Sequence, residues 1–90
     1  MEFSWDHGKR LKTIEDRDLD FADAALFFDG RPVVHQPTPR HDEDRWKSTM
    51  VIEDKFFTVV WLWRQETRHI VSMRRVHAQE IRKYRDLHSG

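Results

Sequence analysis

The strand-like run at residues 67–75 carries side chains that bind phosphate or exchange protons. Because successive side chains of a strand alternate, the run places Arg68, Ser72 and Arg74 on one face and His69 on the other. Arginine suits phosphate, since its planar fork donates two parallel hydrogen bonds. Histidine titrates closest to neutral pH. The run therefore predicts phosphate binding and acid–base chemistry, with a purely structural histidine as the alternative.

A helix is predicted to follow, from Val76 to Leu87. Helical spacing brings His77, Glu80 and Tyr84 into one sector of its surface, where they share an environment. Imidazole, carboxylate and phenol groups transfer protons or position a substrate. Two simpler roles stay open: Glu80 as an ion-pair partner of the preceding arginines, and Tyr84 as a side chain packed on the sheet.

These residue types match the requirements of RNA cleavage without a metal. In that reaction the RNA 2′-hydroxyl attacks the neighbouring phosphorus, which requires a base, an acid for the leaving oxygen and cations for the charge on the phosphorane. The six histidines lack a tight ligand spacing, so neither a metal site nor a cofactor is predicted. The predicted catalytic residues are His69, Arg74, Glu80 and Tyr84, and the predicted RNA-binding residues are Arg45, Arg64, Arg68 and Arg75.

The net charge of the chain is zero, but its distribution is uneven. Residues 1–30 carry eight acids and four bases, whereas residues 56–90 carry seven bases and three acids. A phosphate backbone responds to a local basic surface and not to total charge. The C-terminal third is therefore the expected RNA surface, with a solvated basic face that balances an acidic one as the alternative.

Length and composition narrow the class of protein. Ninety residues without cysteine predict one domain, residues 1–90, that folds without disulfides. A chain this short buries a modest core, so an open surface site is expected. No apolar run approaches the roughly 20 residues of a membrane span. The N-terminus lacks the layout of a signal peptide, so a cytoplasmic location is expected.

Hydrophobic periodicity predicts two helices before the main strands. A short strand at 2–5 precedes a helix at 6–17, with Asp6 as the N-cap. Asp20 is predicted to cap a second helix, which ends near Gly30. The buried stripe of this second helix is predicted at α-helical spacing: Phe21, Ala24, Ala25 and Phe28.

Four further strands are predicted, and short turns join the last three of them, which favours an antiparallel sheet. The apolar strand at 56–63 suits a central position covered on both sides, with Trp61 and Trp63 in the core. The chain is therefore predicted to be α+β: an antiparallel four- to five-stranded sheet, two N-terminal helices and a C-terminal helix. The predicted strands are 33–36, 45–53, 56–63 and 67–75.

Short motifs along the chain resemble, in their order and spacing, those of one family. The most specific is the series Ser72-Met73-Arg74-Arg75 followed by Glu80 and Tyr84. The others are Phe3-x-Trp5-Asp6, Phe21-x-x-Ala24, Phe28-Asp29 and Arg45-Trp46. Together they resemble the BrnT toxins of bacterial type II toxin–antitoxin systems, and the resemblance runs from Glu2 to Tyr84.

The resemblance implies a RelE/ParE-like fold and a cytoplasmic bacterial endoribonuclease that cuts mRNA, inhibits translation and arrests growth. It also implies a BrnA-type antitoxin as the neutralising partner. Contact with DNA is expected only through that antitoxin, which represses the operon in complex with the toxin. A toxin dimer within this complex is left open, and no membrane partner is expected.

Three positions depart from the family pattern. Asp16-Arg17-Asp18 stands where the family usually has Lys-His-Gly, Trp61 where it often has His, and His69 where it usually has Arg. These changes remove cationic and acid–base groups, and Arg17 and His69 are suited to replace them. The alternatives are a weakened toxin that serves as an antitoxin-binding module in operon control, and a gyrase-directed toxin of the same superfamily.

Overall fold

The computed structural model describes residues 2–38, 42–52 and 55–76, together with residues 82 and 86. The helix predicted from Val76 to Leu87, with His77, Glu80 and Tyr84, therefore lies almost entirely outside the described residues. Within the described ranges, no helix is long and apolar enough to cross a membrane.

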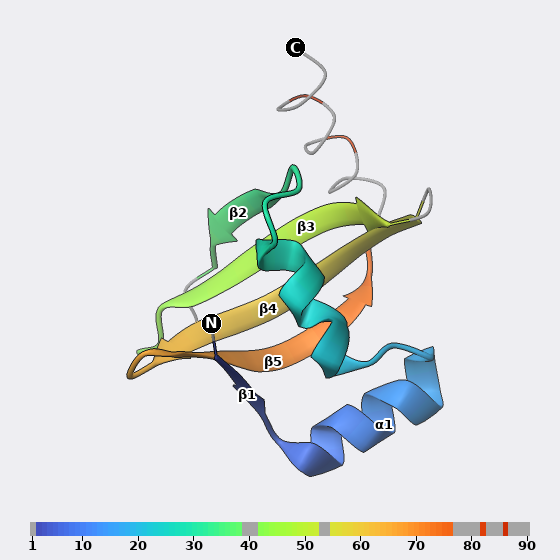
Figure 1. Ribbon diagram of the computed structural model, residues 1–90, viewed down its shortest axis with the longest axis vertical. Helices are drawn as coiled ribbons and strands as arrows, with labels where there is room; N and C mark the ends of the chain where they lie inside the picture. The colour runs from blue at the N-terminus through green and yellow to red at the C-terminus, as the bar shows by residue number, and fades with distance from the viewer. Residues whose placement is uncertain (1, 39–41, 53–54, 77–81, 83–85, 87–90) are drawn as a thin grey trace.

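Five strands form one sheet in the order β1-β5-β4-β3-β2 (Figure 1). Each lies within one residue of its predicted bounds, and the antiparallel pairing is confirmed for β2 to β5. Strand β1, however, pairs with β5 in parallel, so the sheet is mixed. The prediction was wrong for this pair. A short turn makes antiparallel only the two strands that it joins, and β1 and β5 are distant in sequence. The strands are β1 (Phe3–Trp5), β2 (Val34–Pro37), β3 (Arg45–Ile52), β4 (Lys55–Arg64) and β5 (Thr67–Arg75).

The first helix, α1 (His7–Arg17), begins at the predicted cap. The Asp6 carboxylate accepts a hydrogen bond from the Lys9 amide at 2.8 Å. Figure 1 shows α1 alongside the β5 edge of the sheet, beyond the end of β1. Its last residue, Arg17, donates to the Met73 carbonyl at 2.9 Å, which satisfies a backbone acceptor of β5. No residue of α1 is buried, so polar contacts contribute much of what holds it in place.

The second helix is a 3₁₀-helix, η1 (Phe21–Phe28), and not the predicted α-helix. Asp20 caps it as predicted, accepting from the Ala22 amide at 3.0 Å. The predicted burial of Ala25 is wrong and that of Phe28 is only partial, because three residues per turn bring every third side chain inward. The buried residues of η1 are Phe21, Ala24 and Phe27.

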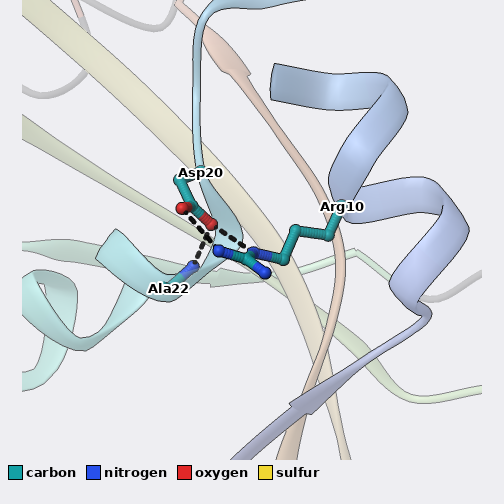
Figure 2. Close-up of polar contacts among 3 residues, drawn as sticks. All are labelled: Arg10, Asp20 and Ala22. Carbon is teal, nitrogen blue, oxygen red and sulfur yellow. Dashed lines mark hydrogen bonds and ion pairs between the residues drawn. The ribbon is translucent and has the colours of Figure 1, made fainter. Parts of the chain in front are cut away.

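An ion pair connects the two helices, as Figure 2 shows. The Arg10 guanidinium donates to both carboxylate oxygens of Asp20, at 2.7 and 3.0 Å. This bidentate contact, together with the Ala22 amide, lowers the pKa of Asp20 to about 2. Because Asp20 also caps η1, one carboxylate fixes both the start of η1 and its position relative to α1.

The hydrophobic core lies between η1 and one face of the sheet, which we call the helix-covered face (Figure 1). Residues paired directly across adjacent strands share a face, so the register assigns each side chain to one side. The side chains on the other side, the opposite face, include Arg45, Val60, Leu62, His69 and Ser72. The buried core consists of Phe21, Ala24, Phe27, Met50, Val59, Trp61, Ile70 and Met73.

Candidate functional site

A β-bulge in β5 interrupts the alternation on which the sequence prediction relied. Val60 pairs with Ser72, whereas the next residue, Trp61, pairs with Ile70. Val71 is therefore the extra residue on β5. Beyond an inserted residue, every side chain of the strand lies on the face opposite to the one that simple alternation assigns to it.

The bulge corrects the predicted grouping of the candidate residues. Alternation alone placed Arg68 with Ser72 and Arg74, and His69 on the other face. In the structure His69 shares the opposite face with Ser72 and Arg74, because their partners on β4 point to that side. Arg68 instead pairs with Trp63 on the helix-covered face. His69 and the motif residue Arg74 therefore lie on the same face of the sheet.

His69 lies in a row of residues that crosses the opposite face. Arg45 pairs with Leu62, Leu62 with His69, and His69 with Ser4. Since neighbouring strands are about 4.8 Å apart, the backbones of Arg45 and His69 are roughly 10 Å apart. This row places an arginine and a histidine on either side of one buried leucine.

The His69 ring is held by one hydrogen bond and has a depressed pKa. Its Nδ1 lies 2.9 Å from the Ser4 hydroxyl, which leaves Nε2 as the ring nitrogen for a substrate. Burial lowers the pKa of His69, and the positive charges of Arg64 and Lys9 lower it further, against weaker effects of Asp6 and Glu43. The imidazole is therefore neutral at pH 7, which is the form that accepts a proton.

Beside this row, a cavity of about 460 Å³ lies between α1 and the opposite face; Arg45 belongs to both the row and the cavity, whereas His69 does not line the cavity. Four cations and one acid line it, a formal excess of three positive charges, and we call it the cationic cavity. Ser72 of the family motif lines it as well. The charged lining residues are Lys9, Lys12, Asp16, Arg17 and Arg45, and the remainder are Thr13, Phe21, Thr38, Val60, Val71 and Ser72.

Apart from Arg17, the contribution of α1 was missed by the sequence prediction, although the sequence contains a signal for it. Five residues of α1 that line the cavity follow the i, i+3, i+4, i+7, i+8 spacing of a helix stripe that faces inward. The stripe was not recognised because it is polar, whereas a core stripe is apolar. A polar stripe at this spacing indicates a helix that faces a solvent-filled site. Its members are Lys9, Lys12, Thr13, Asp16 and Arg17.

Residues 16–18, which depart from the family pattern, lie at the end of α1. Asp16 and Arg17 both line the cationic cavity, so Arg17 retains one positive charge where the family has Lys-His. Asp16 lies 3.5 Å from Lys12 and offsets its charge. Asp18 is the C-cap of α1 with φ of 56°, a left-handed conformation that glycine adopts without strain.

The four predicted RNA-binding arginines are divided between the two faces. Arg45 lines the cationic cavity, and Arg64 is close enough to His69 to lower its pKa. Arg68 lies over the rings of Phe28, Trp61 and Trp63 at 4.0, 5.0 and 4.6 Å, and burial lowers its pKa. The fourth, Arg75, lies over the Phe57 ring on the helix-covered face at 5.7 Å.

Of the four predicted catalytic residues, Glu80 and Tyr84 lie outside the described residues. His69 and Arg74 share the opposite face but not one location. Arg74 pairs with Thr58, five residues along β5 from His69, or roughly 15 Å at the rise of a strand. The two side chains are therefore suited to different phosphates of an extended strand.

Trp61 has a structural role at the position where the family often has histidine. It is 5 % exposed, as predicted for the core, and its indole donates to the Ser48 hydroxyl at 2.8 Å. That hydroxyl also contacts His35 Nδ1 at 2.6 Å. Trp63, predicted to be buried as well, is 50 % exposed.

Together, the fold and the site define a class: a small α+β protein with a cationic cavity beside a neutral histidine, suited to a phosphodiester substrate. Among the described residues, no cluster of three or more potential metal ligands is found. The chain matches the family of BrnT ribonuclease toxins of type II toxin–antitoxin systems over residues 5–80, and it belongs to that family. Membership implies an antitoxin partner. No curated protein matches the sequence.

Proposed function

We propose that this chain is a metal-independent endoribonuclease toxin that cuts single-stranded mRNA in the cytoplasm and is neutralised by a BrnA-type antitoxin. The observation that carries the proposal is the cationic cavity beside a histidine of lowered pKa. Family membership supplies the ribonuclease class. The geometry adds which residues would contact the RNA.

In the proposed reaction, His69 Nε2 accepts the proton of a ribose 2′-hydroxyl, whose oxygen attacks the adjacent phosphorus. The 5′-oxygen leaves, and a 2′,3′-cyclic phosphate remains on the upstream fragment. Arg45 neutralises the additional charge on the phosphorane, where preorganised cations stabilise the transition state most. Arg17, which contacts the Met73 carbonyl four residues along β5 from His69, binds a neighbouring phosphate. Ser4 holds the imidazole ring. Glu80 is the proposed acid for the leaving oxygen, on its motif position alone.

A second candidate function is favoured by one observation, the acidic side chain of Asp16 in the cavity. A toxin weakened by this charge would retain antitoxin binding and act in operon control without cutting RNA. The two candidates share the partner and differ only in the reaction, so one assay separates them.

The test is cleavage of a labelled single-stranded RNA by the purified protein in excess EDTA. The proposed reaction predicts fragments that end in a 2′,3′-cyclic phosphate. It also predicts no cleavage when the same sequence carries 2′-deoxyribose at the cut site. Induced expression is expected to arrest growth. Absence of both cleavage and growth arrest, with the antitoxin still bound, would establish the binding module instead.

A further inference from the structure

A second cavity, of about 510 Å³, lies where β3 begins and β4 ends. It shares only Arg45 with the cationic cavity. We call it the acidic groove, because three acids and one base line it. Its lining residues are Pro37, Asp42, Glu43, Asp44, Arg45, Trp46, Leu62 and Trp63.

The apolar part of the groove is a fixed aromatic surface. Trp63 is 50 % exposed and lies beside other aromatic rings, so that part of an apolar patch faces solvent. Its ring is held by an edge contact with Trp61 at 5.4 Å and by the Arg68 guanidinium at 4.6 Å. Trp46 stacks on Trp61 at 6.1 Å and adds a second ring to the groove. An exposed tryptophan that is already ordered loses little entropy on binding, which is typical of the centre of a protein interface.

The charge of the groove selects the occupant. Arg45 is 3.4 Å from Glu43 and satisfies that carboxylate in part. Neither Asp42 nor Asp44 forms an ion pair with another described residue. Two carboxylates beside the exposed Trp63 indole repel RNA phosphates and attract a lysine or arginine side chain, which the ring face also attracts.

We infer that the acidic groove is the docking surface for an extended, basic segment of the antitoxin. One lysine or arginine of that segment lies between Asp42, Asp44 and the Trp63 ring, and a neighbouring apolar side chain packs on Pro37 and Trp46. This inference rests on the toxin–antitoxin family and not on the proposed RNA cleavage. Antitoxin binding and RNA binding are thereby assigned to different cavities on either side of Arg45.

The experiment measures the affinity of the purified antitoxin, encoded beside the toxin, for the full-length toxin by calorimetry at low and high salt. One variant combines Asp42→Asn, Glu43→Gln and Asp44→Asn, which keep the side-chain shapes. We expect it to weaken binding about tenfold at low salt and less at high salt. Trp63→Ala is expected to weaken binding about 30-fold at either salt concentration. The control is Glu15→Gln, which neutralises an exposed acid of α1 that lines neither cavity and leaves antitoxin affinity within about twofold.

Thermal unfolding of each variant separates loss of binding from loss of fold, and the three charge-neutralising changes are tested independently of Trp63. Unchanged antitoxin affinity in both variants overturns the inference. A fall in oligouridylate binding with unchanged antitoxin binding would assign the groove to RNA. Altered sedimentation of the toxin alone after Trp63→Ala would assign it to self-association. None of these readouts requires RNA cleavage, so failure of the proposed nuclease activity leaves this test intact.

Discussion

Two cavities meet at Arg45 and differ in charge, composition and origin. The cationic cavity has a formal excess of three positive charges and lies between α1 and the opposite face. The acidic groove has three acids against one base and lies where β3 begins and β4 ends, lined by the exposed Trp63 and the partly buried Trp46. A net charge of zero therefore conceals two local fields of opposite sign. Each field favours a different partner, a polyanion in one cavity and a basic segment in the other.

The N-terminal third contributes positive charge to the cationic cavity. Residues 1–30 are acidic in total, yet three of the four cations of the cationic cavity come from α1. Most acids of this region lie elsewhere, for example Asp20, which is paired with Arg10. Local charge at a site follows from which side of a helix faces it, and not from the sum over a segment.

The largest expected effect separates the two cavities by activity. His69→Gln removes the proposed base, so the rate of RNA cleavage should fall about 10²- to 10⁴-fold while antitoxin affinity is unchanged. In the unmodified protein, cleavage should be lost as the pH falls through the lowered pKa of His69, since only the neutral ring accepts a proton. The measurement is single-turnover cleavage from pH 4 to 8. His7→Gln, at the start of α1, is the control, and equal loss in both variants would contradict the assignment.

Arg45 belongs to both cavities, so its replacement should act on them in opposite directions. Arg45→Gln removes a cation from the cationic cavity and should weaken oligouridylate binding about tenfold. In the acidic groove it leaves Glu43 without its ion pair, and affinity for a basic antitoxin segment should rise. Calorimetry with both ligands gives the two signs. A change of the same sign for both ligands would show that the cavities are not separate binding sites.

A smaller gain is expected from removing the acid in the cationic cavity. Asp16→Asn releases Lys12 from its 3.5 Å ion pair and should tighten RNA binding about two- to threefold. The slope of binding against salt should steepen by up to about 0.7 if Lys12 gains a phosphate contact. Glu15→Gln, which does not line either cavity, is the matched control. No gain in affinity would mean that RNA does not reach α1.

Acid should weaken the ion pair between Arg10 and Asp20 that connects α1 to η1. The pKa of Asp20 is about 2 in the folded protein, below its ordinary value, so its contribution to stability is complete above pH 5 and lost between about pH 4 and 2. Asp20→Asn keeps the cap but abolishes this pH dependence. Denaturant unfolding across pH 2–7 measures it, with Asp23→Asn on the same helix as control. An identical pH profile in wild type and Asp20→Asn would refute the ion pair.

The smallest effect concerns the end of α1. Asp18→Gly should raise the free energy of unfolding by about 1 kcal/mol, because glycine adopts φ of 56° without strain and removes a negative charge from a helix C-terminus. Glu15→Gly, in the helix interior, should instead lower it by about 1 kcal/mol. Thermal or denaturant unfolding distinguishes the two. Destabilisation by Asp18→Gly would indicate that the Asp18 side chain has a role beyond capping.

Much of the fold was predictable because local patterns determine it. The five strands and the caps at Asp6 and Asp20 follow from alternation and from side chains that accept from free amides. The 3₁₀ geometry of η1 was not predictable, since Phe21, Ala24 and Phe27 fit a spacing of three as well as Phe21, Ala24 and Phe28 fit an α-helix. The parallel pairing of β1 depends on a contact between the two ends of the described chain.

One part of the candidate site can also be predicted from local sequence, whereas the other part depends on the tertiary structure. The residue types, the family motif from Ser72 to Arg75 and the charge asymmetry between the ends of the chain can be read from the amino-acid sequence. Which of these residues lie on the same face and line the same cavity depends on the tertiary structure. One bulge at Val71 brings His69 to the side of Ser72 and Arg74, and the packing of α1 against β5 adds Lys9, Lys12 and Arg17. The reason is physical: residue type is a local property, whereas the face and the neighbour of a side chain depend on register and packing across the whole sheet.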